Sequence, residues 1–428
     1  MTAGRLCGRA LRLSTASLRP EMRTPDLSVV VVHHRGEEHL REALAAIENS
    51  TRGMGAETIL VDNTSLPGAL EGVLRAHPSV RRIRAGGNAG FAKGCRLGVE
   101  AASASTIAFV NDDAVVETPA LPRLLETLAA APEDVTAVAG RLVDRTGERN
   151  DFSDGFLTFD GHAFQKDPGR ALSELGDSGS EAAAGERLFA CGGLMAVRRE
   201  EFLSSGGFDD DYFAYLEDVD FGWRQWIFGR RILFVPSAVA RHRGGATGEA
   251  LGLFARGFLF EKNAFSTAWK NFDEEHFRLL MPGIFAAFVG RIGEMLATRN
   301  PGAAELLRDP YSGASNGSSG GASSSFWRRA FGISASAAAN EGVVVDDPLT
   351  IAHLRALLWI HRHQEALAEK RRAVQARRRR SDAEIFARFP LRIVPTYPGD
   401  ERFDGAWFQE LLGRAPRLVR TSLQEIFG

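Results

Sequence analysis

The sequence has 428 residues, of which 44% are hydrophobic and 25% charged, and its formal net charge at pH 7 is −2. This composition is ordinary for a globular protein with a large apolar core, and it excludes the strong basic field that attracts nucleic acid. The three cysteines, Cys7, Cys95 and Cys191, form no CxxC pair, so the pattern indicates a reducing, cytoplasmic setting without a zinc ribbon or disulfide framework.

The first 26 residues carry five arginines against two acidic residues. That composition resembles a transit peptide, although a disordered tail or a misassigned start, with Met22 as the true one, is the simpler interpretation. No uninterrupted apolar run reaches the ~20 residues that a membrane-spanning helix needs. The nearest candidate, 279–296, is interrupted by Pro282 and Arg291.

From residue 27 the chain alternates apolar runs with amphipathic segments. Strands are predicted at 27–32, 57–63, 80–86, 106–113 and 135–144, and helices at 37–49, 67–77, 89–103 and 121–131. This alternation predicts βαβ units and a mostly parallel α/β sheet flanked by helices. Ligands bind such sheets beyond the carboxyl ends of the strands, so the residues there are the first candidates for a site.

The pattern weakens between 145 and 186, and then predicts a strand at 193–198, a helix at 217–228 and a strand at 231–235. Beyond residue 250 it is helical, with a long helix or helix pair at 349–389. We therefore divide the chain into a tail (1–26), an α/β domain (27–250), a helical extension (251–311), a flexible Gly/Ser linker (312–325) and a C-terminal helical region (326–428).

Asp62 and Asn63 close the second predicted strand. A carboxylate there can accept a hydrogen bond from the N3–H of a uracil or thymine ring, and the alternative is an Asx turn that ends the strand. The Gly-rich segment GGNAGFAKG, 86–94, opens the third helix. It matches neither the dinucleotide fingerprint nor a P-loop, so a phosphate-binding helix start and a tight turn both remain open.

Three polar residues, Asn111, Asp112 and Asp113, lie at the end of the apolar strand predicted at 106–113. Neighbouring acids disfavour each other's ionisation unless a cation offsets them, and Mg²⁺ or Mn²⁺ prefers such oxygen ligands. One acid can bind the cation while its neighbour faces a ribose hydroxyl; the alternative is a solvated acidic loop. His242, after the strand at 231–235, is a candidate third ligand, although a lone histidine is usually structural.

A second acidic group, Glu217, Asp218 and Asp220, lies at a predicted helix start. The helix dipole alone favours acids there, whereas a functional interpretation makes one of them a general base. The arginine-rich stretch 371–380 is either a solvated helical face or, together with 279–296 lying in the membrane plane, a surface for anionic lipid heads.

In order, the motifs VVVVHHR, VDN, GGNAGFAKG, VNDDAVV, CGGLMAVRREEF, GGFDDDYFAYLEDVDFGWR and HRGG resemble a family 2 glycosyltransferase of the GT-A type. The similarity is greatest to the bacterial rhamnosyltransferase-like and galactofuranosyltransferase-like branch, and it covers 27–250, about half of the chain. Two positions depart from the family pattern. His33, His34 and Arg35 replace the usual Tyr/Thr–Asn-like pair, and Asn111 replaces an acid seen in many relatives.

The resemblance implies a role for each motif residue. Asp218 is the catalytic base, with Glu217 and Asp220 as secondary candidates; Asp113, His242 and Asn111 bind Mg²⁺ or Mn²⁺; Asp62, Asn63, Asn88, Gly90, Asp112, Gly192 and Gly193 bind the donor. Asp62 contacts the base, Asp112 lies near the ribose or diphosphate, and the CGG segment forms the wall between the donor and acceptor pockets.

The implied function is inverting transfer of a sugar from a UDP- or dTDP-linked donor to the hydroxyl of a glycan, a lipid-linked sugar or a small molecule, in assembly of the cell wall or of another cell-surface glycan. The implied location is the cytoplasm or the inner face of the plasma membrane. Two rival functions remain, a sugar nucleotidyltransferase and a non-catalytic membrane-associated scaffold of the same fold. The nucleotidyltransferase calls for a Gly-rich basic loop after the first strand, and HHRGEEHL, 33–40, is a poor match.

Overall fold

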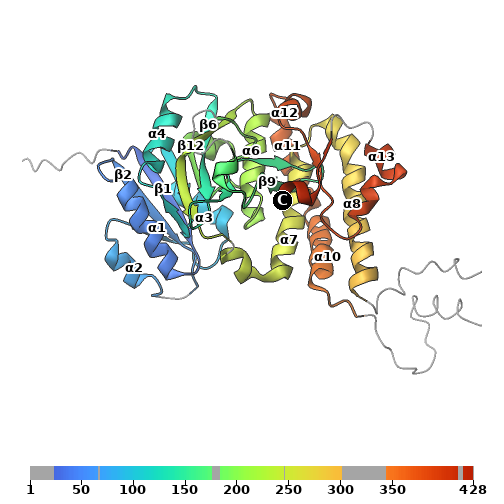
Figure 1. Cartoon of the computed structure of the whole chain (residues 1–428), viewed down its shortest axis with the longest axis horizontal. Helices are drawn as coiled ribbons and strands as arrows, with labels where there is room; N and C mark the ends of the chain where they lie inside the picture. The colour runs from blue at the N-terminus through green and yellow to red at the C-terminus, as the bar shows by residue number, and fades with distance from the viewer. Residues whose placement is uncertain are drawn as a thin grey trace, which may run out of the picture.

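The computed structural model of the protein describes residues 24–65, 68–175, 184–244, 246–300, 344–412 and 418–427, without the side chains of 246–250. An α/β part occupies one side of the molecule and a layer of helices the other (Figure 1). The expected Gly/Ser linker at 312–325 lies outside the described residues, as does most of the expected tail.

The expected α/β sheet is present and is mixed. Its strands are β1 (Leu27–His33), β2 (Ala56–Asp62), β3 (Arg81–Arg84), β4 (Thr106–Val110), β5 (Ala114–Val116), β6 (Val135–Val143), β7 (Asn150–Phe152), β10 (Gly185–Glu186), β11 (Leu194–Arg198) and β12 (Arg231–His242). The order is β10-β12-β6-β11-β4-β1-β2-β3, with β5 paired to β12 and β7 to β6. Strands β3, β2, β1 and β4 are parallel, as are β6 and β12, whereas β11 runs antiparallel between β4 and β6.

Helices cover both faces of the sheet: α1 (Glu37–Ser50), α2 (Glu71–Ala76), α3 (Phe91–Ala101), α4 (Ala120–Ala130), α5 (Arg199–Ser204) and α6 (Glu217–Ile227). Helix α3 packs closely on β1 because Gly94 and Gly98 face Val32 and Val30. A Cβ added at Gly98 would lie 2.3 Å from a Val30 methyl carbon. The second half of the Gly-rich motif is therefore explained by packing between helix and strand.

The helical layer consists of α7 (Ala246–Asn271), α8 (Glu274–Arg299), α10 (Pro348–Arg362), α11 (Gln364–Ala376), α12 (Asp382–Arg388), α13 (Ala406–Leu412) and α14 (Leu423–Phe427). The expected long helix or helix pair at 349–389 is thus three helices, and the last begins at a capping box of Ser381 and Glu384. One apolar core runs from α1 and α4 through α6 to α7, α8 and α12 without a break at residue 250.

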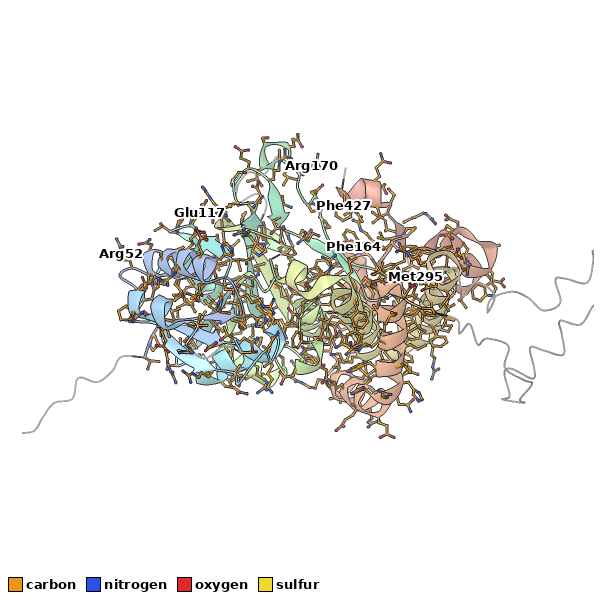
Figure 2. The ribbon with its side chains drawn as sticks, turned by 90° about the horizontal axis from the view of Figure 1, so that it is seen from below. Arg52, Glu117, Phe164, Arg170, Met295 and Phe427 are labelled. Atoms are coloured by element: carbon orange, nitrogen blue, oxygen red, sulfur yellow. The ribbon has the colours of Figure 1, made fainter. Side chains whose placement is uncertain are left out.

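A small β-hairpin joins the α/β part to the end of the chain. Its strands are β8 (Gly155–Leu157) and β9 (Ala163–Gln165), and the segments β13 (Arg392–Ile393) and β14 (Val419–Arg420) form a separate parallel pair. Phe164 of β9 packs against a cluster of Phe156, Val394 and Ile426, and Figure 2 shows its side chain near Phe427. The last residues therefore pack onto the α/β part.

The arginine-rich stretch 371–380, for which a solvated face and a lipid-binding surface were both open, is solvated only in part, because four of its arginines donate to backbone carbonyls of other elements. Arg371 donates to Trp269 and Phe272, and Arg378 to Asn271, at the carboxyl end of α7. Cations are favourable there because helix ends expose unpaired carbonyls and a partial negative charge. Arg377 donates to Ser204 at the end of α5 and Arg380 to Arg230 beyond α6. These four guanidinium groups tie α11 and the turn before α12 to the rest of the fold.

Helix α8 is long and apolar enough to cross a membrane, with a mean hydropathy of 1.5 in its best window, but 44% of that window is buried inside the protein. Its Arg291 is 3% exposed and lies 2.6 Å from a carboxylate oxygen of Asp400 and 2.9 Å from one of Asp160. Burying ions is costly unless they are paired. The buried ion cluster therefore anchors α8 between the hairpin loop and the C-terminal segment.

We predict that Arg291→Met destabilises the protein by about 3–5 kcal/mol, because it leaves the Asp400 carboxylate buried without its cation and Asp160 with His162 as its remaining partner. The matched control is Arg278→Met on the same helix, whose exposed pair with Glu274 is worth at most about 1 kcal/mol. Urea unfolding of both variants measures the difference. Equal losses of unfolding free energy would show that the cluster is not a stabilising anchor.

Candidate active site

Polar residues from three parallel strands meet at one edge of the sheet, because the carboxyl ends of β1, β2 and β4 lie side by side. His33 ends β1, Asp62 ends β2 at the same register, and Asn111 follows β4. The short strand β5 then pairs antiparallel with the end of β12, which places His242 opposite Ala114.

That pairing brings His242 against the acids after β4. Its Nε2 lies 3.1 Å from Oδ1 of Asp113 and 3.3 Å from Nδ2 of Asn111. On the other side of the ring, Nδ1 lies 2.6 Å from Oδ2 of Asp151. The structure thus brings together the three residues expected to bind a cation. It also adds Asp151 of β7, which sequence analysis missed because the stretch 145–186 has no regular pattern.

The neighbouring carboxylates favour the protonated form of this histidine. Burial alone would lower the pKa of His242, but the hydrogen bonds that its ring donates to Asp113 and Asp151 raise the pKa to about 10. Burial would likewise raise the pKa of Asp113, and the histidine lowers it instead. A cation that replaced the proton at Nε2 would meet an ionised carboxylate and an imidazole oriented by Asp151, which is the usual arrangement around metal-bound histidines.

The donor set fits a small divalent cation. Adjacent ligands of an octahedral ion with bonds of about 2.1 Å lie about 3 Å apart, and the Asp113 and His242 donor atoms are 3.1 Å apart. Asn111 contributes an oxygen if its amide turns over, since amide oxygen and nitrogen are assigned from the hydrogen-bond network. One carboxylate, one imidazole and one amide leave further positions for substrate oxygens.

Asp62 forms the Asx turn at the end of β2 that we gave as the alternative to recognition of a donor base. Its Oδ1 accepts hydrogen bonds from the backbone and hydroxyl of Thr64, and its Oδ2 forms an ion pair with Arg82. Burial would raise the pKa of Asp62, but these partners lower it. The side chain is only 5% exposed, so contact with a donor base remains a prediction.

Asn63 holds the Gly-rich loop. Its amide accepts from the backbone N–H of Ala89 at 2.8 Å and donates to the Asn88 side chain and the Gly90 carbonyl. Gly90 has φ +86°, and a Cβ there would lie 2.5 Å from the backbone oxygen of Phe213. Gly90 is therefore required for contact with the segment before α6, and a role in phosphate binding remains a prediction.

His33, one of the departures from the family pattern, is bonded to a predicted donor-binding residue. The buried ring lies 2.6 Å from Oδ2 of Asp112. This contact fixes the Asp112 carboxylate at the edge of the sheet and leaves its other oxygen available to a ligand. A role for Asp112 near the ribose or diphosphate remains a prediction.

The CGG turn, residues 191–193, connects the predicted base to the predicted cation site. The backbone N–H of Gly192 donates to Oδ2 of Asp218 at 3.0 Å, and the Gly193 carbonyl accepts from the N–H of Asn111. A Cβ at Gly192 would come within 3.0 Å of the Phe91 ring. Two adjacent residues thus link Asp218 and Asn111, which lie in different elements.

The three acids at the start of α6 differ in their partners and in the direction in which their pKa is shifted. Burial raises the pKa of Asp218, although backbone N–H groups of Gly192 and Val219 oppose the shift. Glu217 is 5% exposed, and among the described residues its Oε2 has no hydrogen-bond partner, so burial raises its pKa well above the usual range. Both groups retain the higher basicity that suits a general base.

Asp220, predicted as a secondary candidate for the general base, does not suit that role in the structure. It is fully buried, and its two oxygens are paired with Arg224 at 2.9 Å and with Lys270 at 3.1 Å. These cations lower its pKa although burial alone would raise it. The side chain therefore faces the helical layer, where it forms part of a buried ion network.

The backbone before α6 is strained in a way that the sequence did not reveal. Phe213, Tyr215 and Leu216 have φ values of 64°, 71° and 63°. Each such conformation costs a non-glycine residue about 1–3 kcal/mol and is frequent at active sites. The strain occurs directly before Glu217 and Asp218, so the surrounding structure must hold the predicted base in place.

Comparison with known proteins supports the family expected from the motifs. Residues 28–202 match the model for glycosyl transferase family 2. The chain is 28% identical over 260 residues to an N-acetylglucosaminyl-diphospho-decaprenol L-rhamnosyltransferase of Mycobacterium tuberculosis, covering 53% of this chain and 78% of that protein. It is 26% identical over 234 residues to a putative polypeptide N-acetylgalactosaminyltransferase 10 of Drosophila melanogaster, covering 51% of this chain and 36% of that protein.

Two solved structures are similar at 17% identity. GalNAc-T7 with UDP, GalNAc and Mn²⁺ has a TM-score of 0.47 and covers 66% of this chain, which spans 54% of that structure. The mannosyltransferase PcManGT from Pyrobaculum calidifontis with GDP-Man and Mn²⁺ has a TM-score of 0.42, with coverages of 78% and 86%. The model match over part of the chain and the rhamnosyltransferase relative both agree with the family expected from the motifs. Neither rival function is favoured.

We predict that Gly90→Ala disrupts the contact between the Gly-rich loop and Phe213. Gly86→Ala is the matched control, because Gly86 has nearly the same φ, +82°, and open space around its Cβ position. The control should lose about 1–2 kcal/mol of stability through its backbone conformation alone. Gly90→Ala should lose about 1–3 kcal/mol more through the collision. Thermal unfolding compares them, and equal losses would contradict the contact.

Proposed function

We propose that this chain, whose residues 28–202 form a glycosyl transferase family 2 domain, is a cation-dependent glycosyltransferase that inverts the anomeric carbon of a nucleoside-diphosphate sugar. The observation that supports this most strongly is the convergence of two groups at one edge of the sheet. The Asp113–His242 pair and the Asp218 carboxylate are joined through Asn111 and the CGG turn.

The cation would be held by Asp113, His242 and, with its amide turned, Asn111. Bound Mg²⁺ or Mn²⁺ offsets the charge that builds on the departing nucleoside diphosphate. Asp151 keeps the imidazole in the orientation and tautomer that present Nε2 to the ion. Asp112, fixed by His33, is left to accept a hydrogen bond from the donor.

Asp218 is the proposed general base. The acceptor oxygen attacks the anomeric carbon as its proton passes to the Asp218 carboxylate, and the bond from that carbon to the phosphate oxygen breaks. The Gly192 N–H fixes one carboxylate oxygen, and partial burial keeps the group basic enough to take the proton. Holding both substrates in attack geometry supplies much of the remaining acceleration.

The substrate proposal rests on the mycobacterial relative, which by its name transfers L-rhamnose to a lipid-diphosphate-linked sugar. We propose a deoxyhexose donor linked to thymidine or uridine diphosphate, and a lipid-linked acceptor in assembly of a cell-surface glycan. A donor screen with each nucleotide sugar should then give its largest Mn²⁺-dependent thermal stabilisation with a deoxyhexose donor.

We further propose that the protein acts in the cytoplasm at the inner face of the plasma membrane, where a lipid-linked acceptor would lie. The exposed Phe285 and Val289 of α8 support this placement, since apolar side chains on a helix can enter a bilayer surface. Phe285→Ser should reduce co-sedimentation with anionic vesicles, whereas Leu358→Ser, an exposed apolar residue on α10, serves as the control. Full recovery of the wild-type protein in the supernatant would count against membrane contact.

We predict that Asp218→Asn preserves donor binding and reduces sugar transfer by roughly 10²–10⁴-fold, the usual contribution of a general base. The control is Asp134→Asn, since Asp134 precedes β6 at the opposite edge of the sheet and pairs with Arg231. Transfer assays and calorimetry with the donor and Mn²⁺ measure the two quantities. Wild-type turnover in Asp218→Asn would refute the assignment of the base.

A further inference from the structure

The segment that leads into α6 is held by residues of another element. Residues 209–216 carry three non-glycine residues with positive φ and end at Glu217 and Asp218. Within the segment, backbone hydrogen bonds run only from Tyr212, Phe213 and Ala214 to neighbours two or three residues back. Such a conformation persists only where outside contacts over-determine it.

Asn263 of α7 supplies those contacts. Its side-chain nitrogen lies 3.1 Å from the carbonyl oxygen of Tyr212, 2.9 Å from that of Ala214 and 2.7 Å from that of Tyr215. The residue is fully buried. Turning the amide over would point its oxygen at three carbonyl oxygens, so the network fixes the nitrogen toward the segment.

The side-chain oxygen of Asn263, unlike its nitrogen, makes no favourable polar contact within the part of the chain that the structure describes. It is buried, and among the described residues it has no hydrogen-bond partner. Leaving a buried acceptor unpaired costs free energy. Ordinary packing would be served as well by an apolar side chain, so the amide is best explained by its bonds to the three carbonyls.

Other residues on the same face of α7 reinforce the segment. Lys262 donates to the Asp211 carbonyl, the Thr267 and Tyr212 hydroxyls lie 2.6 Å apart, and the Lys270 amine lies 2.7 Å from Asp209. Lys370 of α11 adds ion pairs to Asp209 and Asp211. Among these, only Asn263 bonds the carbonyl of a strained residue, Tyr215, together with the carbonyls of Tyr212 and Ala214 beside the other strained positions.

We propose that Asn263 is a positioning residue, which sets the attack geometry of Asp218 by fixing the backbone carbonyls of Tyr212, Ala214 and Tyr215. The proposal rests on the proposed function, in which Asp218 is the base. It extends the catalytic unit beyond the α/β part of the chain.

The test uses the full chain with three substitutions. Asn263→Ala removes the donor, Asn263→Asp places a carboxylate against the carbonyls, and Asn263→Gln keeps an amide on a longer stem. We expect kcat to fall by about 100-fold in the first two, the loss typical of an ångström-scale misplacement, and by less in Asn263→Gln. Affinity for UDP or dTDP with Mn²⁺, measured by calorimetry, should not change, because Asn263 does not touch the cation site.

The pH profile separates positioning from general destabilisation. Burial raises the pKa of Asp218 in the wild-type protein, so the acid limb of kcat, which reports deprotonation of the base, should move to lower pH when the segment relaxes toward solvent. The matched control is Asn300→Ala. Asn300 is also fully buried, and its amide donates to Met295 and Thr350 away from the site. This variant should lose stability but keep kcat and its pH profile.

The outcomes separate failure of the positioning role of Asn263 from failure of the proposed transferase function. If Asn263→Ala and Asn263→Gln match Asn300→Ala in kcat and pH profile, the positioning role is overturned while the transferase assignment stands. If the wild-type protein transfers no sugar, or Asp218→Asn retains full turnover, the proposed function fails instead. Should Asn263→Ala and Asn263→Asp not fold, Asn263→Gln decides, because unchanged kcat and pH profile in that variant also overturn the proposal.

Discussion

The site depends on one piece of strand pairing, the antiparallel contact between β5 and the end of β12. Parallel strands alone bring Asp62 and Asn111 to a common edge, but His242 lies 129 positions after Asp113 in the sequence. The register of β5 against β12 sets His242 opposite Ala114, and the ring then meets the Asp113 carboxylate. Without that register, Asp113, Asp151 and His242 would not meet, and they could not share a ligand.

The helical layer completes the site. The family match ends at residue 202, before the predicted base and before His242. The predicted base is placed by helices that follow, because α6 begins after a strained segment and α7 supplies the buried polar groups that keep the segment in place. His242 is placed by β12. Arginines of the 371–380 stretch in turn cap the carboxyl end of α7. One continuous apolar core joins the α/β part to the helical layer, which agrees with a site built from both parts.

Local patterns in the sequence predicted the sheet, most of its helices and the residues at the strand ends, because strand periodicity and terminal acids are encoded over a few neighbouring positions. They could not predict Asp151 or Asn263, whose partners lie 91 and 48–51 residues away. They also did not reveal that four of the 371–380 arginines bind backbone carbonyls of other elements. A basic segment looks the same in sequence whether its cations face water or the carbonyls of another helix, and only tertiary contacts decide between the two. The environment of Asp220 was missed for a similar reason, since one of its two cationic partners, Lys270, belongs to α7.

The most direct test of the central claim is a crystal structure with Mn²⁺ and a nucleoside diphosphate, with the ion located by its anomalous signal. The account predicts one strong peak at about 2.1 Å from Asp113 and His242, an expected cation–ligand distance, with diphosphate oxygens completing the coordination and the Asp218 carboxylate facing the same cleft. An ion bound elsewhere, or a diphosphate held at this edge of the sheet without Asp113 and His242, would contradict it.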